Sequence, residues 1–401
     1  MRGLTIVIPA LNEEEAIGDT IERCLAAGDA IREAAGLEFV ETIVVSDGST
    51  DQTAEIARGY EGIGLVVFEK NRGYGAAIKE GWRRGSGDLV GFLDADGTCD
   101  PMYFAQMCRL MVEEPVDVVL GSRLGPDSKM PLVRRVGNRF YALLLGFLCG
   151  RHVTDAASGM RVVRRDALDE LYPLPDGLHF TPSMSARAML NNLRVVEIPM
   201  SYEERVGQST LSVFADGVRF LRTIIDGVLC YRPERILLLA FAFCVLLVVL
   251  LGATPTEFYA KNARLEEWMI YRFVACWLLG SSGLLLLLAT SLTNRMASFS
   301  RRRIDAETFW ASLIRVAFGP RLLLALIAAL VVASGWSLWP GLVEYATTGG
   351  VTLHWSRLLA GALGLLSAFQ CAVFAVLLRV VTVWQANVMQ PPSETSATRP
   401  Q

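Results

Sequence analysis

An apolar run ends in two carboxylates in the stretch Leu89-Val90-Gly91-Phe92-Leu93-Asp94-Ala95-Asp96-Gly97. The apolar residues predict a buried strand, and the polar residues stand at its carboxyl end. Two carboxylates at the tip of a buried strand repel each other unless a cation lies between them. Oxygen ligands suit a hard ion such as Mg²⁺ or Mn²⁺, which commonly bridges protein carboxylates to a diphosphate. Taken alone, the same residues are also typical of a solvated acidic turn.

Short apolar runs alternate with helical patterns on both sides of this stretch. Further strands are predicted at 4–8, 42–45 and 65–68. Helical periods occur between them, at 13–27, 51–58 and 76–84. This order predicts a mostly parallel, Rossmann-like α/β sheet covered by helices on both faces. Because ligands of such sheets bind beyond the carboxyl ends of the strands, we expect the polar clusters at 9–13, 46–51 and 94–96 to meet in one crevice.

The second half of the chain is apolar in long segments that carry no internal charge. These segments are 236–254, 272–292, 321–339 and 358–380. Each is close to the roughly 20 residues that a helix needs to cross about 30 Å of hydrocarbon. They predict an α-helical transmembrane domain over 236–383, and burial in a large soluble core is the alternative.

Basic residues lie between the second and third apolar segments. The arginines in and beside this loop are Arg295, Arg301, Arg302, Arg303 and Arg321. By the positive-inside rule the loop faces the cytoplasm. An even number of crossings then puts both ends of the chain on that side. The sequence therefore predicts a multi-pass membrane protein with a cytoplasmic domain at 1–210 and a disordered cytoplasmic tail at 384–401.

Composition argues against several other kinds of protein. The net charge is only −3, which gives no electrostatic case for a nucleic-acid partner. Three histidines leave few ligands for a histidine-based metal site. The eight cysteines form no Cys-x-x-Cys pair, and several stand in apolar runs. They are expected to be reduced, buried thiols rather than disulfides or zinc ligands.

Two segments between the soluble and apolar parts have one apolar helical face. Residues 131–149 begin with arginines and end apolar, and residues 211–235 form a candidate juxtamembrane helix. The apolar stripe of the second segment comprises Phe214, Val218, Leu221, Ile225 and Leu229. Both segments are consistent with helices that lie on the membrane surface with arginines at anionic headgroups. Ordinary core helices of the first domain are the other interpretation.

Four strings in the first domain resemble family 2 glycosyltransferases of the GT-A fold. They are Val7-Ile8-Pro9-Ala10-Leu11-Asn12-Glu13-Glu14, Val45-Ser46-Asp47-Gly48-Ser49-Thr50-Asp51, Asn71-Arg72-Gly73-Tyr74-Gly75 and Asp94-Ala95-Asp96. Three more strings resemble the polyprenyl-phosphate sugar synthases, a group that includes dolichyl-phosphate mannose and glucose synthases and bacterial relatives acting on undecaprenyl phosphate. These are Gly121-Ser122-Arg123, Asp155-Ala156-Ala157-Ser158-Gly159-Met160-Arg161 and Glu203-Glu204-Arg205-Val206-Gly207-Gln208-Ser209. The resemblance implies a GT-A catalytic domain followed by transmembrane helices.

The resemblance also implies a nucleotide-sugar donor, linked to UDP or GDP. Asp47 would accept hydrogen bonds from the base or ribose. Asp96 would bind Mg²⁺ or Mn²⁺ directly, and Asp94 would contact the metal or the ribose. Arg205 would clamp the diphosphate, because its planar fork pairs with phosphate oxygens. The implied donor-binding residues are Pro9, Leu11, Asn12, Glu13, Asp47, Gly73, Lys79, Asp94, Ala95, Asp96 and Arg205.

The implied acceptor is a polyprenyl phosphate in the lipid bilayer. Arg123, Arg134 and Asn138 stand where the family holds the acceptor phosphate, although Arg134, like Arg135 and Arg139, could instead contact only lipid headgroups. Asp155 would orient a hydroxyl of the reacting sugar, or it could simply cap a turn. A phosphate monoester is already ionised near neutral pH, so it needs positioning more than deprotonation. The implied catalytic residues are Asp94, Asp96, Asp155 and Arg205.

Three functions follow from these observations. The leading hypothesis is an inverting, metal-dependent hexosyltransferase that moves one sugar to a polyprenyl phosphate at the cytoplasmic membrane face. A processive polysaccharide synthase shares the fold and the helices, but the chain has no Gln-x-x-Arg-Trp string. A non-catalytic sugar-lipid-binding membrane protein would not need Asp47, Asp96 and Arg205 together. Packing of Gly361 and Gly364 against a second copy, in a homo-oligomer, is left open.

Overall fold

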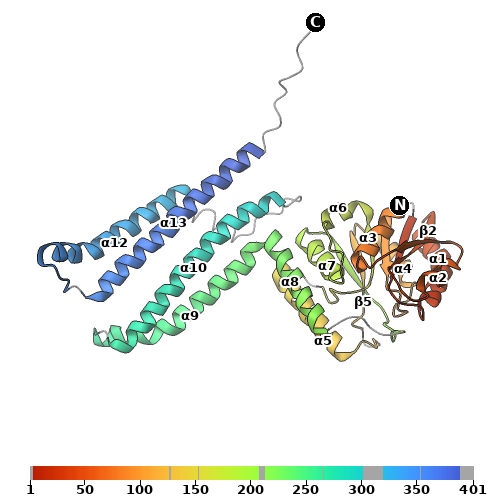
Figure 1. The fold of residues 1–401 in the computed structure, drawn as a ribbon, viewed down its shortest axis with the longest axis horizontal. Helices are drawn as coiled ribbons and strands as arrows, with labels where there is room; N and C mark the ends of the chain where they lie inside the picture. The colour runs from red at the N-terminus through yellow and green to blue at the C-terminus, as the bar shows by residue number, and fades with distance from the viewer. Residues whose placement is uncertain are drawn as a thin grey trace, which may run out of the picture. The chain divides into compact units, whose positions relative to one another are not determined.

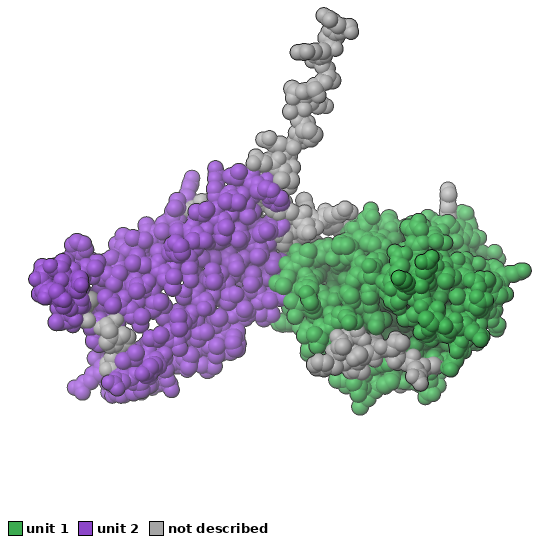
Figure 2. Space-filling view, viewed as in Figure 1, with its two compact units in different colours: residues 1–231 green, residues 232–401 purple. Residues whose placement is uncertain are grey.

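The structure, a computed structural model, describes two units of the chain. It covers residues 3–125, 128–151, 153–206, 213–264, 266–300, 319–352 and 354–388. Contacts between residues divide the chain into Met1–Tyr231 and Arg232–Gln401, which have different colours in Figure 2.

A seven-stranded sheet forms the centre of the first unit (Figure 1). Its strands are β1 (Gly3–Ala10), β2 (Phe39–Asp47), β3 (Ile63–Phe68), β4 (Leu89–Leu93), β5 (Val118–Ser122), β6 (Met160–Arg164) and β7 (Val195–Pro199). The order across the sheet is β3-β2-β1-β4-β6-β5-β7. Strand β6 runs antiparallel to β4 and β5, and the other pairings are parallel. The predicted mostly parallel α/β fold of GT-A type is confirmed.

Helices cover the sheet between the strands. They are α1 (Ile17–Ala35), α2 (Thr53–Arg58), α3 (Tyr74–Arg84), α4 (Tyr103–Glu113), α5 (Leu132–Cys149), the 3₁₀ turn η1 (Arg165–Ala167), α6 (Leu168–Leu171), α7 (Phe180–Leu190) and α8 (Val213–Tyr231). Alternate strand residues supply two separate cores. In β1, Leu4 and Ile6 belong to the core with α1 and α4, whereas Val7 belongs to the core with α3 and α7. This alternation is what burial on both faces of a strand requires.

The pairing of the strands decides where the polar motifs lie. Strands β1, β2 and β4 are parallel neighbours, so their carboxyl ends share one edge of the sheet. Strand β6 runs the other way, and the register Leu93↔Met160 brings the segment before β6 to that edge. The register Ser122↔Pro199 places the segment after β7 beside the end of β5. All the sequence motifs therefore reach the same edge.

Helix α5 leaves an apolar stripe uncovered. Its residues Leu132, Val133, Val136, Phe140, Leu143 and Phe147 are between 54% and 74% exposed. The opposite side of the helix is held, since Leu145 and Leu148 are buried and the Tyr141 hydroxyl donates to the Gly217 carbonyl on α8 at 2.8 Å. Helices α5 and α8 both belong to the first unit and pack on α7.

The second unit consists of long apolar helices. In its described ranges these are α9 (Pro233–Asn262), α10 (Glu267–Ser300), α12 (Pro320–Thr348) and α13 (Trp355–Val388). All four are long and apolar enough to cross a membrane, as predicted for the four segments. Arg301, Arg302 and Arg303, which support the predicted cytoplasmic loop, lie outside the described residues. The predicted disordered tail at 384–401 begins inside α13, which continues to Val388, and the rest of the tail lies outside the described residues.

Two glycines allow α12 and α13 to approach closely. A Cβ on Gly361 would lie 2.4 Å from Cγ of Leu338, and one on Gly364 would lie 2.3 Å from Oγ of Ser334. Small residues at such a crossing let apolar helices pack without polar contacts. The idea that these glycines pack against a second copy is therefore corrected, because they face α12 of the same chain.

Candidate active site

The loops after β1 and β2 are locked together at the shared edge. Asn12 has a left-handed backbone (φ 55°), and its Oδ1 accepts from the Thr50 amide at 2.8 Å. The Glu13 amide donates to Oγ1 of Thr53 at 2.9 Å. Pro9 is the penultimate residue of β1, and Leu11 follows the strand. The predicted donor-binding string thus forms one rigid turn whose shape depends on the second loop.

Asp47 ties the loop after β3 to the end of β2. Its two carboxylate oxygens accept from the amides of Arg72 and Gly73 at 2.7 and 2.8 Å. Burial raises the pKa of Asp47, and these amide bonds oppose the increase. Gly73 has φ 105°, and a Cβ there would lie 2.4 Å from the Asp176 carbonyl, so the position requires glycine.

Lys79 on α3 contacts the segment before α7. Its ammonium group donates to the Leu174 carbonyl at 2.8 Å and pairs with Asp176 at 2.6 Å. Lys79 therefore links helix α3 to the segment before α7. The contacts of Lys79 in the structure are with Leu174 and Asp176, and its predicted approach to the donor phosphates stays a prediction.

Asp94 and Asp96 are held in different ways. Oδ1 of Asp94 accepts from the Tyr74 hydroxyl at 2.6 Å, and Oδ1 of Asp96 accepts from Oγ1 of Thr98 at 2.7 Å. Burial raises the pKa of Asp94 to about 6, and the charge of Asp96 adds to the increase. Ala95 between them is buried, and its carbonyl accepts from Oγ1 of Thr20 at 3.2 Å. Each carboxylate is therefore fixed by a hydroxyl group that donates to its Oδ1 atom.

Arg205 reaches this pair from the segment after β7. Its guanidinium pairs with Glu13, and Nη1 lies 3.4 Å from Oδ2 of Asp96. Burial raises the pKa of Glu13 to about 7, although the charge of Arg205 opposes the increase. The Val206 amide donates to the Asp96 carbonyl at 3.2 Å, which docks the segment along the Asp94–Asp96 turn. An arginine here supplies positive charge to a cluster of three carboxylates.

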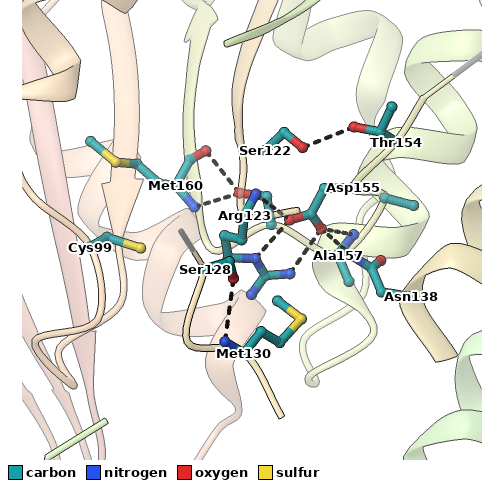
Figure 3. Close-up of polar contacts among 12 residues, drawn as sticks. Cys99, Ser122, Arg123, Ser128, Met130, Asn138, Thr154, Asp155, Ala157 and Met160 are labelled. Atoms are coloured by element: carbon teal, nitrogen blue, oxygen red, sulfur yellow. Dashed lines mark hydrogen bonds and ion pairs between the residues drawn. The ribbon is translucent and has the colours of Figure 1, made fainter. Parts of the chain in front are cut away.

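A second cluster surrounds Asp155 (Figure 3). Nε and Nη2 of Arg123 donate to the two Asp155 oxygens at 2.8 and 2.9 Å. Nδ2 of Asn138 donates to Oδ1 of Asp155 at 2.7 Å. Burial tends to raise the pKa of Asp155, but the charge and hydrogen bonds of Arg123 lower it overall. Asp155 is therefore a buried, ionised carboxylate, and two of the predicted acceptor-binding residues hold it.

Arg134 lies on α5 one turn before Asn138. It is partly exposed, as expected for a side chain at the border of the apolar stripe. The Nη1 atom of Arg123 forms no hydrogen bond within the described part of the chain, and the ring of Tyr202 lies 5.6 Å from its guanidinium carbon. One edge of the Arg123 guanidinium thus remains for a ligand.

Sequence reasoning missed the supporting roles of three residues in these clusters. Glu197 on β7 accepts from the amides of Thr154 and Asp155 at 2.9 and 3.0 Å, and nothing in its sequence context signals this. Tyr74 lies in the recognised string at 71–75, yet its bond to Asp94 depends on how α3 crosses the sheet. Arg161, fully buried, donates to the Ala156 and Ser158 carbonyls and so fixes the segment that carries Asp155.

The acidic residues suit a cation that brings its own further ligands. Among the described residues, no group of three His, Cys, Asp or Glu side chains forms a complete metal site. Asp94 and Asp96 offer carboxylate oxygens of the kind that Mg²⁺ and Mn²⁺ prefer. Glu13 lies beside this pair, and Arg205 contacts Glu13 and Asp96. The donor set fits a hard ion held partly by the protein.

Comparisons with known proteins find relatives of this chain. The family model described as "Glycosyl transferase family 2" matches residues 5–172. The chain is 31% identical over 224 residues to the dolichyl-phosphate hexose transferase of Haloferax volcanii. The aligned region covers 55% of this chain and 92% of that protein. It is 34% identical over 237 residues to the low-salt glycan biosynthesis hexosyltransferase Agl6 of the same organism, covering 57% of this chain. The chain spans 55% of the length of Agl6.

A solved structure also resembles the first unit. It is glucosyl-3-phosphoglycerate synthase from Mycobacterium tuberculosis, in complex with Mn²⁺, uridine diphosphate and glucosyl-3-phosphoglycerate. The two chains are 23% identical, with a TM-score of 0.45 over 57% of this chain and 80% of that one.

Proposed function

Because the chain belongs to glycosyl transferase family 2, we propose that it moves a single sugar from a nucleotide-sugar donor to a polyprenyl phosphate. The inverting mechanism, the cytoplasmic location of the reaction and the residue roles below are parts of the same proposal. The observation that carries the lipid acceptor is the apolar stripe on α5, because the same helix supplies Asn138 to the Asp155 cluster.

The donor would bind across the loops that end β1, β2 and β4. Asp47 is buried, with 2% of the residue exposed, and it accepts two backbone amides; its remaining acceptor positions would receive a hydrogen bond from the base or ribose. Pro9, Leu11, Asn12 and Glu13 form the turn beside it. Gly73 allows the backbone to come close to a ligand, since a larger residue cannot be placed there. These contacts support recognition of a nucleotide without identifying uracil or guanine.

Asp94 and Asp96 would hold Mg²⁺ or Mn²⁺ together with oxygens of the donor diphosphate. When bound, such an ion stabilises the negative charge that develops on the departing nucleoside diphosphate. Arg205 is proposed to share this task. In the structure it pairs with Glu13 and Asp96, and its planar fork is equally suited to phosphate oxygens. Turning from carboxylate to phosphate would release Glu13 and Asp96 when the donor enters.

The acceptor phosphate would lie between Arg123 and Arg134. Two donors of the Arg123 fork are fixed on Asp155, and Nη1 is left to the phosphate. Asn138 shapes the same place from α5 through its bond to Asp155. Because the phosphate is already ionised, these residues need only bring its oxygen to the anomeric carbon. Asp155 would orient a sugar hydroxyl while Arg123 keeps it charged.

Helix α5 would bring the first unit to the lipid. An apolar stripe with residues more than half exposed is unusual on a soluble domain and typical of a helix in a membrane interface. Arg134, Arg135 and Arg139 on the same helix can meet anionic headgroups. A lipid phosphate held at this surface would reach the Asp155 cluster without leaving the bilayer. Attack on the sugar from the side opposite the diphosphate would invert the anomeric configuration.

One assay separates this proposal from its alternatives. Membranes containing the chain are incubated with labelled UDP- and GDP-sugars, Mn²⁺ and polyprenyl phosphate, and the lipid is then extracted. Label in the lipid that disappears with Asp96→Ala and persists with Asp19→Ala supports the proposal, since Asp19 is a surface carboxylate paired only with Arg23 at 3.6 Å in the described chain. Label in a water-soluble polymer supports a processive synthase, and no transfer from any donor supports a binding protein.

A further inference from the structure

The carboxylate of Asp94 is held at both of its oxygens. Oδ1 accepts from the Tyr74 hydroxyl at 2.6 Å, which is short for a hydrogen bond and typical of one to a charged group. Oδ2 lies against the backbone of Gly159, where an added Cβ would be only 1.8 Å away. The two contacts come from opposite sides, from helix α3 and from the segment before β6. Together they leave the Asp94 side chain a single orientation.

The Tyr74 ring is itself fixed by aromatic neighbours. Its centroid lies 6.4 Å from that of Phe92 on β4 and 6.4 Å from that of Phe180 on α7, both in edge-on geometry. Trp82 is the fourth ring of the group, and its centroid lies 6.0 Å from that of Phe92 and 5.7 Å from that of Phe180. Such rings gain from edge-on packing beyond their burial. The Tyr74 hydroxyl is therefore held by a packed aromatic cluster, and it donates to Asp94.

We propose that Tyr74 is a positioning residue which, with Gly159, holds Asp94 in the orientation that binds the cation and donor diphosphate. This inference rests on the proposed function. Tyr74 does not touch the donor in this account, and it acts through Asp94. Asp96 is held differently, by Thr98, so the two carboxylates of the pair are oriented by separate devices.

The chemistry of the contact suits this task. Burial and the charge of Asp94 raise the pKa of Tyr74 well above its usual value, so the phenol stays protonated and can only donate to the carboxylate. The bond in turn favours the charged form of Asp94, against the effect of burial. Loss of the hydroxyl would let the Asp94 side chain rotate away from the orientation that Tyr74 and Gly159 impose, and that change weakens a cation site.

The test uses Tyr74→Phe in the full chain and measures Mn²⁺ affinity by electron paramagnetic resonance in the presence of UDP. A hydrogen bond to a charged group contributes enough that we expect affinity to fall about ten- to a hundredfold. At saturating Mn²⁺ the transfer rate should recover most of its value, so the defect appears in KM for the metal rather than in kcat. The control is Tyr60→Phe, since Tyr60 donates to Glu22 at 2.8 Å on the exposed surface. That variant should bind Mn²⁺ like the wild type.

A second variant approaches Asp94 from the other side. Gly159→Ala introduces the Cβ that overlaps Oδ2, and it should lower Mn²⁺ affinity at least as much while leaving the aromatic cluster unchanged. Wild-type Mn²⁺ affinity in a folded Tyr74→Phe or Gly159→Ala protein would overturn the inference. A loss of affinity in both variants, without sugar transfer by the wild type to any lipid, would support the positioning role and sink the proposed acceptor. The Mn²⁺-binding measurement thus distinguishes a failure of the positioning role from a failure of the proposed lipid acceptor.

Discussion

Replacing Arg123 by methionine removes the charge from a buried ion pair. The guanidinium donates two bonds of 2.8 and 2.9 Å to Asp155, whose side chain is fully buried. Arg83 forms the same two-bond fork with Glu80, at 2.9 and 2.7 Å, on the surface of α3. Its side chain is 70% exposed, whereas that of Arg123 is 12% exposed. Arg83→Met is therefore a control matched in chemistry and different in burial.

The expected cost follows from this difference in burial. Removing one partner of a buried pair costs about 3–5 kcal/mol, because the other charge stays buried. An exposed pair contributes about 0–1 kcal/mol. For a unit of this size, about 1 kcal/mol shifts the unfolding midpoint by roughly 2–4 °C, so Arg123→Met should lower it by roughly 6–20 °C. The double variant Arg123→Met/Asp155→Leu should recover part of the loss, since no unpaired carboxylate then stays buried, while the buried Arg161 loses the nearby charge of Asp155.

The loss should also depend on pH in a known direction. The pKa of Asp155 is lowered in the native protein, so the stability from the pair is present above about pH 4 and is lost below it. Without Arg123, burial would raise the pKa of Asp155 in the folded chain. Each unit of that increase adds about 1.4 kcal/mol to the difference between variant and wild type at neutral pH. The difference in unfolding free energy between Arg123→Met and the wild type should become smaller as the pH falls toward 4.

Unfolding can be followed with a dye that becomes fluorescent on reacting with thiols. Cys24, Cys99 and Cys108 are buried in the first unit and become reactive when it opens. Full-length protein in detergent is heated at several pH values for the wild type, both single variants and the double variant. The reasoning is refuted if Arg123→Met and Arg83→Met behave alike, or if the double variant is less stable than Arg123→Met.

Three further predictions test other parts of the account. Burial raises the pKa of Asp94 to about 6 and of Glu13 to about 7, above their values in the unfolded chain. The unfolding midpoint of the metal-free protein should therefore fall as the pH rises from about 5 to about 8, and it should fall less in the Asp94→Asn variant. Arg205→Lys should raise the donor KM at least about tenfold and leave the acceptor KM unchanged in initial-rate assays, because lysine lacks the fork. Gly361→Val should cost about 1–3 kcal/mol by overlap with Leu338, whereas Gly280→Val, with open space around it, should cost less in thermal unfolding.

The fold could be predicted because its signals are local. Alternation in β1 and the 3.6-residue periods of the helices need no tertiary information, and the long apolar segments, with charge only near their ends, mark the second unit directly. The meeting of the motifs at one edge also followed from the parallel order of the early strands. What sequence order could not supply was the direction of β6, which brings Asp155 to that edge from the other side.

The contacts within the site depend on tertiary packing and could not be predicted. Arg123 and Asn138 were expected to face an acceptor phosphate. In the structure both donate hydrogen bonds to the Asp155 carboxylate, because β5, α5 and the segment before β6 meet there. Lys79 was expected near the donor phosphates, but the crossing of α3 carries it to the segment at 174–176. Residue types indicated the chemistry, and the packing decides which side chains bind each other.

The most direct test of the central claim is the mass of the lipid product. Purified full-length protein is incubated with polyprenyl phosphate, Mn²⁺ and the donor that gives label in the extracted lipid, and the lipid is examined by mass spectrometry. The account predicts one new species, heavier than the acceptor by a single sugar residue and still carrying its one phosphate, which is lost with Asp96→Ala. A ladder of several sugar additions, or a product in which the sugar is not attached to the lipid phosphate, would contradict it.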